Sequence, residues 1–85
     1  MNAYVAKLDI FTRDEIYCLE FEITPTEDVT GFPADEDVLM AFSNMVAGSP
    51  GAYLLPVKVE GENKYYGIPI FSVERVTVNA VNESE

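Results

Sequence analysis

The chain has 85 residues, with 15 Asp and Glu against five Lys and Arg, and a formal net charge of -10. A charge of this size favours positively charged partners and repels nucleic acid and anionic membranes. The length fits a single domain, residues 1–85, and leaves no room for a second core. Hydrophobic residues make up 48% of the chain, so the acidity does not predict disorder, which combines high charge with low hydrophobicity.

The N-terminus and the longest uncharged stretch both argue against a targeting or membrane segment. Residues 1–4 lack a basic region followed by an apolar run, so we expect no signal peptide. Residues 38–57 carry no charge, but Pro50, Pro56 and two glycines interrupt them, and neither part could span a bilayer. We therefore expect no membrane partner and a cytoplasmic protein, located in the host cytoplasm if a phage encodes it.

The first part of the chain predicts an antiparallel hairpin, because apolar and polar side chains alternate in residues 4–12 and again in 15–23. One face of the first run holds Tyr4, Ala6, Leu8 and Ile10. The matching face of the second run holds Tyr17, Leu19, Phe21 and Ile23. The opposite face of the second run carries Cys18, Glu20 and Glu22. This pattern is typical of a sheet with one buried and one solvated face.

One helix is expected in the middle of the chain. Pro25 ends the preceding strand, and Pro33 suits the first turn of a helix, where its missing N–H does no harm. An apolar stripe at helical spacing follows, formed by Val38, Ala41, Phe42, Met45 and Val46. Gly48 fits the C-terminal cap, and Pro50 prevents continuation of the helix.

Three further strands are expected in the last part of the chain, in residues 52–60, 64–71 and 73–81. The first has Tyr53, Leu55, Val57 and Val59 on one face. In the second, Gly67 and Pro69 indicate a bulge or an edge position. The third has Val76, Val78 and Ala80 on one face. Residues 82–85 are expected to form a frayed tail.

The order β-β-α-β-β-β predicts an α+β fold, in which one helix packs on one face of a mostly antiparallel sheet. The alternative is a small curled barrel with the helix plugging one end. Both arrangements place the alternating apolar faces in a single core.

No pattern for catalysis, metal binding or cofactor binding is present, so we expect a protein that is not an enzyme and has no cofactor. The chain contains no histidine, which removes the commonest general base and transition-metal ligand. Neither the P-loop nor the dinucleotide-binding glycine pattern occurs. Cys18, the single cysteine, shares its face with Glu20 and Glu22, whose charges make a thiol a poor nucleophile.

The basic residues do not predict direct binding to nucleic acid, because the five Lys and Arg are dispersed along the chain. The acidic residues are not dispersed. Nine of them, and no basic residue, lie between Asp14 and Asp37. A surface built only for solubility is expected to intersperse both signs.

We therefore interpret part of this acidic run as a surface that docks on a basic protein, in competition with the simpler interpretation that it only keeps the protein in solution. The candidate partner-binding residues are Glu20, Glu22, Glu27, Asp28, Asp35, Glu36 and Asp37. Three consecutive acids on a helix point in different directions, so Asp35, Glu36 and Asp37 are expected to complement the helix dipole and not to hold a metal.

One form of this hypothesis is imitation of a nucleic acid. Residues two apart on a strand are separated by about 6.6–6.8 Å, comparable to two steps of about 3.4 Å along a DNA strand. In size, acidity and lack of catalytic residues, the chain resembles the small inhibitors that phages and mobile elements make against nucleases, restriction systems or CRISPR effectors. This resemblance is one of character and includes no motif. It implies an inhibitor or regulator of a nuclease, polymerase or effector complex.

The alternative hypothesis concerns apolar surface. Tyr53, Tyr65, Tyr66 and Phe71 exceed what one small core is expected to bury. Aromatic residues gathered on one surface form interface hot spots. The protein would then be a homodimer or a self-assembling accessory subunit, with its charge serving only solubility.

Overall fold

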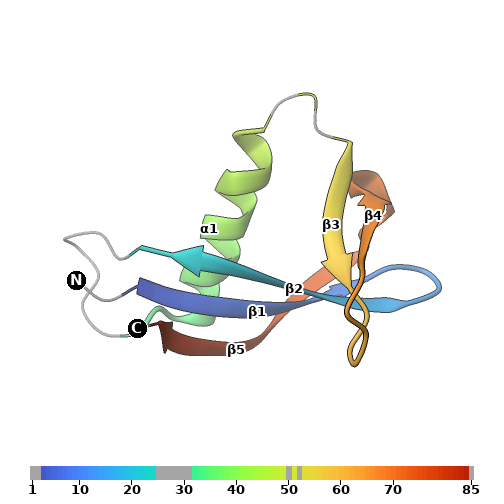
Figure 1. The fold of residues 1–85 in the computed structure, drawn as a ribbon. Coiled ribbons are helices and arrows are strands. Elements are labelled where there is room, and N and C mark those ends of the chain that lie inside the picture. The colour runs from blue at the N-terminus through green and yellow to red at the C-terminus, as the bar shows by residue number, and fades with distance from the viewer. Residues whose placement is uncertain (1–2, 25–31, 50, 52, 85) are drawn as a thin grey trace.

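The structure is a computed structural model that describes residues 3–24, 32–49, 51 and 53–84. Its elements are β1 (Ala3–Phe11), β2 (Ile16–Ile23), α1 (Asp35–Ala47), β3 (Leu54–Lys58), β4 (Tyr65–Pro69), the 3₁₀ helix η1 (Ile70–Ser72) and β5 (Arg75–Ser84). The predicted α+β fold with the order β-β-α-β-β-β is confirmed (Figure 1). The strands form one antiparallel sheet in the order β4-β3-β2-β1-β5. Because β4 and β5 remain separate edges of this sheet, the barrel alternative is wrong.

The core lies between α1 and one face of the sheet. The face of β1 predicted to be apolar is buried, and Leu8 and Ile10 on it have no exposed surface. From the helix, Val38 and Phe42 pack against this face. Leu19 of β2 joins the same cluster. Burial of each such side chain stabilises the fold by about 1.5–3 kcal/mol.

The helix begins at Asp35, two residues after Pro33, which the sequence placed in the first helical turn. Ala34 is the N-cap, so Pro33 lies outside the first turn and not within it. The amide of Ala34 donates to the carboxylate of Asp37 at 3.3 Å, which fixes the start of the helix. At the other end, Gly48 is the C-cap as predicted, and its amide donates to the carbonyl of Asn44 at 2.9 Å.

A β-bulge in β5 changes which of its residues face the core. Lys7 pairs with Ala80 and Leu8 pairs with Val78, so Asn79 is the extra residue. The bulge moves Val81 to the core, where it packs opposite Ala6. The expectation that Ala80 shares a face with Val76 and Val78 is therefore wrong, because a simple alternation does not allow for the extra residue.

The expected frayed tail is also wrong for residues 82–84. These residues continue β5, and the pairing with β1 extends to Ser84, which lies opposite Ala3. The physical reason is that β1 offers a complete partner edge down to its first residue. Glu85 lies outside the described residues.

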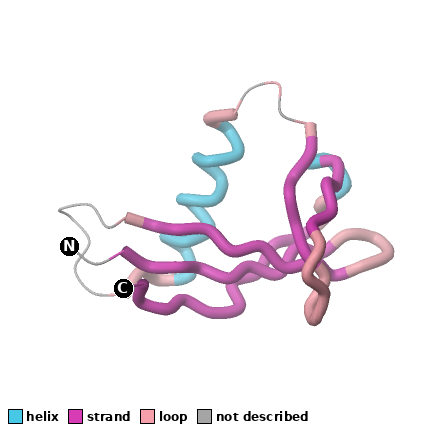
Figure 2. The backbone as a smooth tube through the Cα atoms, viewed as in Figure 1, coloured by secondary structure: helices cyan, strands magenta, loops and turns pink. Residues whose placement is uncertain are grey.

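The β3–β4 hairpin leaves the plane of the other strands (Figures 1 and 2). Five residue pairs join β3 to β4, from Leu54 opposite Pro69 to Lys58 opposite Tyr65. A single pair, Cys18 with Lys58, joins β3 to β2. The hairpin is therefore attached to the sheet at one point of its ladder and diverges from β2 beyond it.

Candidate protein-binding surfaces

The structure divides the predicted acidic residues between two sides of the sheet. Phe21 faces the helix, with its ring centroid 5.9 Å from that of Phe42, so its neighbours Glu20 and Glu22 point to the opposite, open face. Both glutamates are exposed. The acids of the first helical turn are exposed on the helix side: Asp35, Glu36 and Asp37. Glu27 and Asp28 lie outside the described residues.

The open face of the sheet contains one ion pair among the described residues, between Lys7 Nζ and Glu60 Oε2 at 3.0 Å. The hydrogen bond and the charge of Glu60 raise the pKa of Lys7, and the same contact with Lys7 lowers the pKa of Glu60. This pair uses the lysine that lies directly opposite Glu20 in the β1–β2 ladder. Within the described chain, Glu20 and Glu22 therefore remain without an ion pair.

Three of the remaining cations lie over aromatic rings and not beside carboxylates. Lys58 lies 5.5 Å from the ring centroid of Tyr65, Lys64 lies 5.3 Å from that of Tyr66, and Arg75 lies 4.3 Å from that of Phe11. A cation held over a ring in this way is attracted by the quadrupole of the ring. The rings carry no net charge, so these cations keep theirs, and the charge of Lys58 contributes to the lowered pKa of Glu60.

Cys18 lies on the open face, as the alternation predicted. Burial is the main cause that raises the pKa of its thiol, and the charge of Glu60 raises it further. We expected Glu20 and Glu22 to raise the pKa of this thiol. The glutamate that raises it is Glu60, from the loop between β3 and β4. The raised pKa disfavours the thiolate, which is the nucleophilic form of a cysteine.

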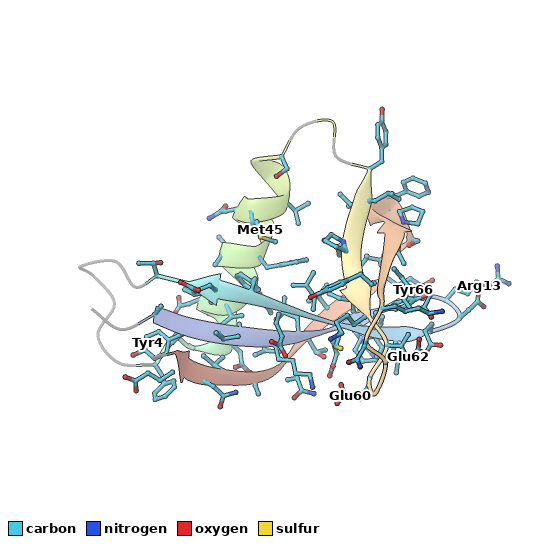
Figure 3. All side chains as sticks on the ribbon, in the orientation of Figure 1. Tyr4, Arg13, Met45, Glu60, Glu62 and Tyr66 are labelled. Atoms are coloured by element: carbon cyan, nitrogen blue, oxygen red, sulfur yellow. The ribbon has the colours of Figure 1, made fainter. Side chains whose placement is uncertain are left out.

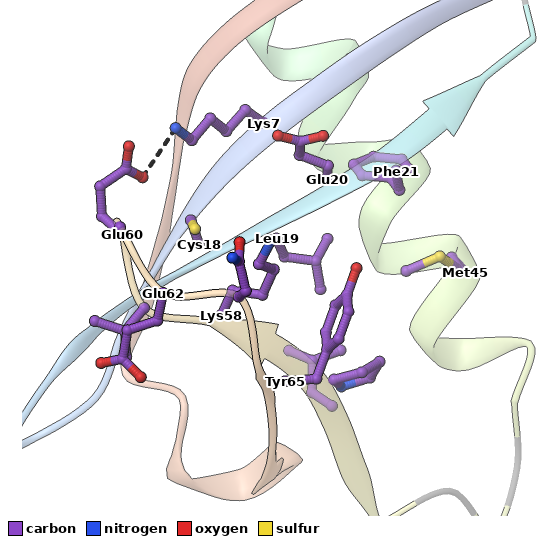
Figure 4. Close-up of a pocket in the computed structure, with 15 residues that line it drawn as sticks. Lys7, Cys18, Leu19, Glu20, Phe21, Met45, Lys58, Glu60, Glu62 and Tyr65 are labelled. Carbon is purple, nitrogen blue, oxygen red and sulfur yellow. Dashed lines mark hydrogen bonds and ion pairs between the residues drawn. The ribbon is translucent and has the colours of Figure 1, made fainter.

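A groove of about 520 Å³ opens where β3 diverges from β2, and we call it the β2–β3 groove (Figure 4). Apolar side chains from three elements contribute to its lining: Phe21 of β2, Met45 of α1 and Leu55 of β3. Charged side chains surround it as well: Lys7, Glu20, Lys58, Glu60 and Glu62. Glu60 and Glu62 lie at the turn of the hairpin (Figure 3). Sequence analysis did not predict that they line the same groove as Glu20, because only the path of the hairpin brings them there (Figure 4).

A second, smaller cavity of about 410 Å³ lies between the helix and the hairpin. Its lining is mainly apolar and includes Phe42 and Val46 of α1, Leu55 of β3 and Ile70 of η1. Leu55 lines both cavities. The second half of α1 and the hairpin therefore face each other without closing the core between them.

The hairpin carries most of the exposed aromatic surface. We call the hairpin surface the group formed by Tyr53, Leu54, Tyr65 and Phe71, whose exposed fractions are 75%, 59%, 72% and 85%. Tyr66 is not part of it, although the sequence grouped it with the others. Its ring centroid lies 6.1 Å from that of Tyr17, and its hydroxyl donates to Glu62 at 2.8 Å. Tyr66 thus connects the hairpin to β2.

Other types of site are not formed by the described residues. No group of three or more Cys, Asp or Glu side chains among them has a geometry that could hold a metal ion. No helix in this part of the chain has the length and apolar character needed to cross a membrane. The surfaces that the structure does form are an acidic open face, a groove beside it and the hairpin surface.

Comparisons of the chain with protein-family models, with curated proteins and with solved structures find no match. The function is therefore inferred from the surfaces of the protein itself.

Proposed function

We propose that this protein is a non-enzymatic binding module that docks on a basic protein through the open face of its sheet. The observation that supports this most is the exposure of Glu20 and Glu22, neither of which forms an ion pair within the described chain. Complementary potentials steer association and select the partner. A net charge of -10 provides such a field around the whole molecule.

Within this proposal, the partner is a protein that handles nucleic acid, such as a nuclease, a polymerase or an effector complex. Such proteins present basic surfaces that bind phosphates. Glu20 and Glu22, about 6.6–6.8 Å apart along the strand, have a separation comparable to two axial steps of about 3.4 Å along a DNA strand. The module would then act as an inhibitor or regulator by occupying a phosphate-binding surface. The helix side carries Asp35, Glu36 and Asp37, away from this face. Only the open face of the sheet would therefore imitate a nucleic acid.

The test is an affinity capture with three forms of the protein, eluted with a salt gradient. The wild type is expected to retain a basic protein that moderate salt releases, because salt screens exposed charges over about 8–10 Å. Glu20→Lys combined with Glu22→Lys is expected to abolish the capture. The matched control is Asp35→Lys with Glu36→Lys, which changes the net charge equally on the helix side and is expected to retain it. Equal capture by both double variants would reject docking through the open face.

The second candidate function is self-assembly through the hairpin surface. The exposure of Tyr53, Tyr65 and Phe71 supports it, because aromatic residues dominate interface energies. Sedimentation at increasing concentration is expected to show dimers or larger species that persist in high salt. Tyr65→Lys with Phe71→Lys would return such species to monomers. A monomer at every concentration and salt level would reject this candidate.

A further inference from the structure

Among the described residues, the outer edge of β2 has no partner strand over most of its length. The inner edge of this strand pairs with β1 from Ile16 to Ile23. The outer edge pairs with β3 only at Cys18. Along residues 19–23, every second residue therefore directs its N–H and C=O away from β1, and no backbone partner for these groups occurs among the described residues. An unpaired strand edge of this kind is a template for another strand.

The β2–β3 groove supplies space and chemistry beside this edge (Figure 4). On the helix side, Phe21 and Met45 line it with apolar surface, and Met45 is 42% exposed. Charged side chains line it as well: the carboxylates of Glu20, Glu60 and Glu62, and the ammonium groups of Lys7 and Lys58. Lys7 is paired with Glu60 at 3.0 Å, so the lining keeps a negative balance. β3 forms the opposite wall of the groove, and it is poorly suited to pair with β2 there because Pro56 has no N–H to donate.

We propose that residues 19–23 of β2 bind an extended segment of a partner protein, which adds to the sheet as a further strand in the β2–β3 groove. A strand in this position presents alternate side chains to the two sides. One set contacts Phe21 and Met45, and the other meets Glu20 and Glu22. The segment therefore alternates apolar residues with Lys or Arg. This inference rests on the proposed function, since it specifies how the basic partner is bound.

The same charges argue against a second copy of this chain as the occupant. A copy would bring another net charge of -10 to an edge that already carries Glu20 and Glu22. Like charges placed together across an interface cost several kcal/mol. The five basic residues of the chain are also dispersed, so it contains no segment that alternates basic and apolar residues. The occupant is therefore a different, basic chain.

The experiment uses a synthetic peptide of alternating lysine and valine, seven residues long and blocked at both ends, with the full-length protein. Binding is measured by titration calorimetry, and amide hydrogen exchange is followed residue by residue. The peptide is expected to slow exchange at the outward-facing amides of residues 19–23, because strand addition gives them hydrogen-bond partners. A control peptide with N-methyl groups on alternate residues has the same charge but cannot complete the ladder, and it is expected to bind at least about tenfold more weakly.

Two protein variants complete the test. Glu20→Lys with Glu22→Lys is expected to weaken binding of the peptide by about tenfold or more, and Asp35→Lys with Glu36→Lys by no more than about threefold. Circular dichroism confirms that both variants fold. Equal binding of the two peptides, or protection confined to β4 or β5, would overturn the proposal. Absence of binding at about 1 mM peptide would do the same.

The outcome is separable from that of the proposed function. If a basic protein is captured through Glu20 and Glu22 while the peptide leaves exchange at residues 19–23 unchanged, docking on the open face stands and strand addition fails. If the combined change Glu20→Lys and Glu22→Lys alters neither the capture nor the binding of the peptide, both proposals fail.

Discussion

The two halves of the sheet differ in how their residues are used. Strands β2 and β5 each pair with β1 along almost their whole length, and the three strands bury one face under α1. The β3–β4 hairpin buries Leu55, Val57 and Ile68, but it meets β2 at one ladder position and exposes most of its other face. Local stability follows buried apolar contact and complete pairing. The packed half therefore holds the fold together and offers its open face and the outer edge of β2 for binding, while the loosely attached hairpin exposes aromatic side chains.

The largest effect is expected in the packed half. Leu8→Ala removes a side chain with no exposed surface from the centre of the core and is expected to lower the free energy of unfolding by about 2.7–5 kcal/mol. The matched change in the hairpin, Leu54→Ala, removes a side chain that is 59% exposed, and is expected to cost about 0.5 kcal/mol or less. Urea denaturation measures both. Similar losses at the two positions would show that the two halves do not differ in this way.

An intermediate effect is expected where the halves meet. Tyr66→Ala removes the ring that packs against Tyr17 and is expected to cost about 2 kcal/mol, less than the 3–5 kcal/mol of a fully buried aromatic residue. Tyr66→Phe keeps the ring and loses only the hydrogen bond to Glu62, at about 1 kcal/mol or less. Hydrogen exchange sharpens the comparison, because Tyr66→Ala is expected to accelerate exchange in β3 and β4 more than in β1. Uniform acceleration would mean that the hairpin does not open separately.

The smallest effect is expected from the ion pair that connects β1 to the hairpin loop. Lys7 lowers the pKa of Glu60, so the contribution of this carboxylate to stability is present above its unfolded pKa and is lost as the pH falls below 4.5 through the folded value. Glu60 raises the pKa of Lys7, so the lysine contributes below its unfolded pKa and ceases to do so as the pH rises above 10.5.

The measurement for this pair is the stability difference between the wild type and Glu60→Gln as a function of pH. The difference is expected to be small and steady between these limits, to shrink beyond both and to decrease with salt. A difference that grows below pH 4.5 would contradict the assigned direction of the pKa change of Glu60.

The sequence predicted the elements well where local patterns determine them. The alternation in β1 and β2 identified the buried face, and Gly48 identified the end of the helix, because both depend on neighbouring residues. The bulge at Asn79 and the length of β5 were missed, since both depend on pairing with β1, which is distant in the sequence. The prediction from Pro33 placed the start of the helix too early. The amide of Ala34 donates to the carboxylate of Asp37, which makes Ala34 the N-cap.

The candidate site was less predictable than the fold. Consecutive acidic residues suggested one surface, but the helix and the open face place Asp35 and Glu20 on different sides of the sheet. Glu60 and Glu62 were missed because only the path of the hairpin brings them to the groove that Glu20 also lines. The edge of β2 that has no partner strand in the described part of the chain could not be predicted either, since it results from the divergence of β3 after a single residue pair.

The bulge in β5 has a consequence for the behaviour of the protein at high concentration. β5 is a long edge strand, and such strands promote aggregation by pairing with strands of other molecules. The extra residue at Asn79, whose side chain donates to Asp9 at 3.1 Å, divides this edge into two shorter pieces with different registers. We therefore expect the bulge to hinder fibril growth from β5, and the mutual repulsion of molecules with a charge of -10 to add to this effect.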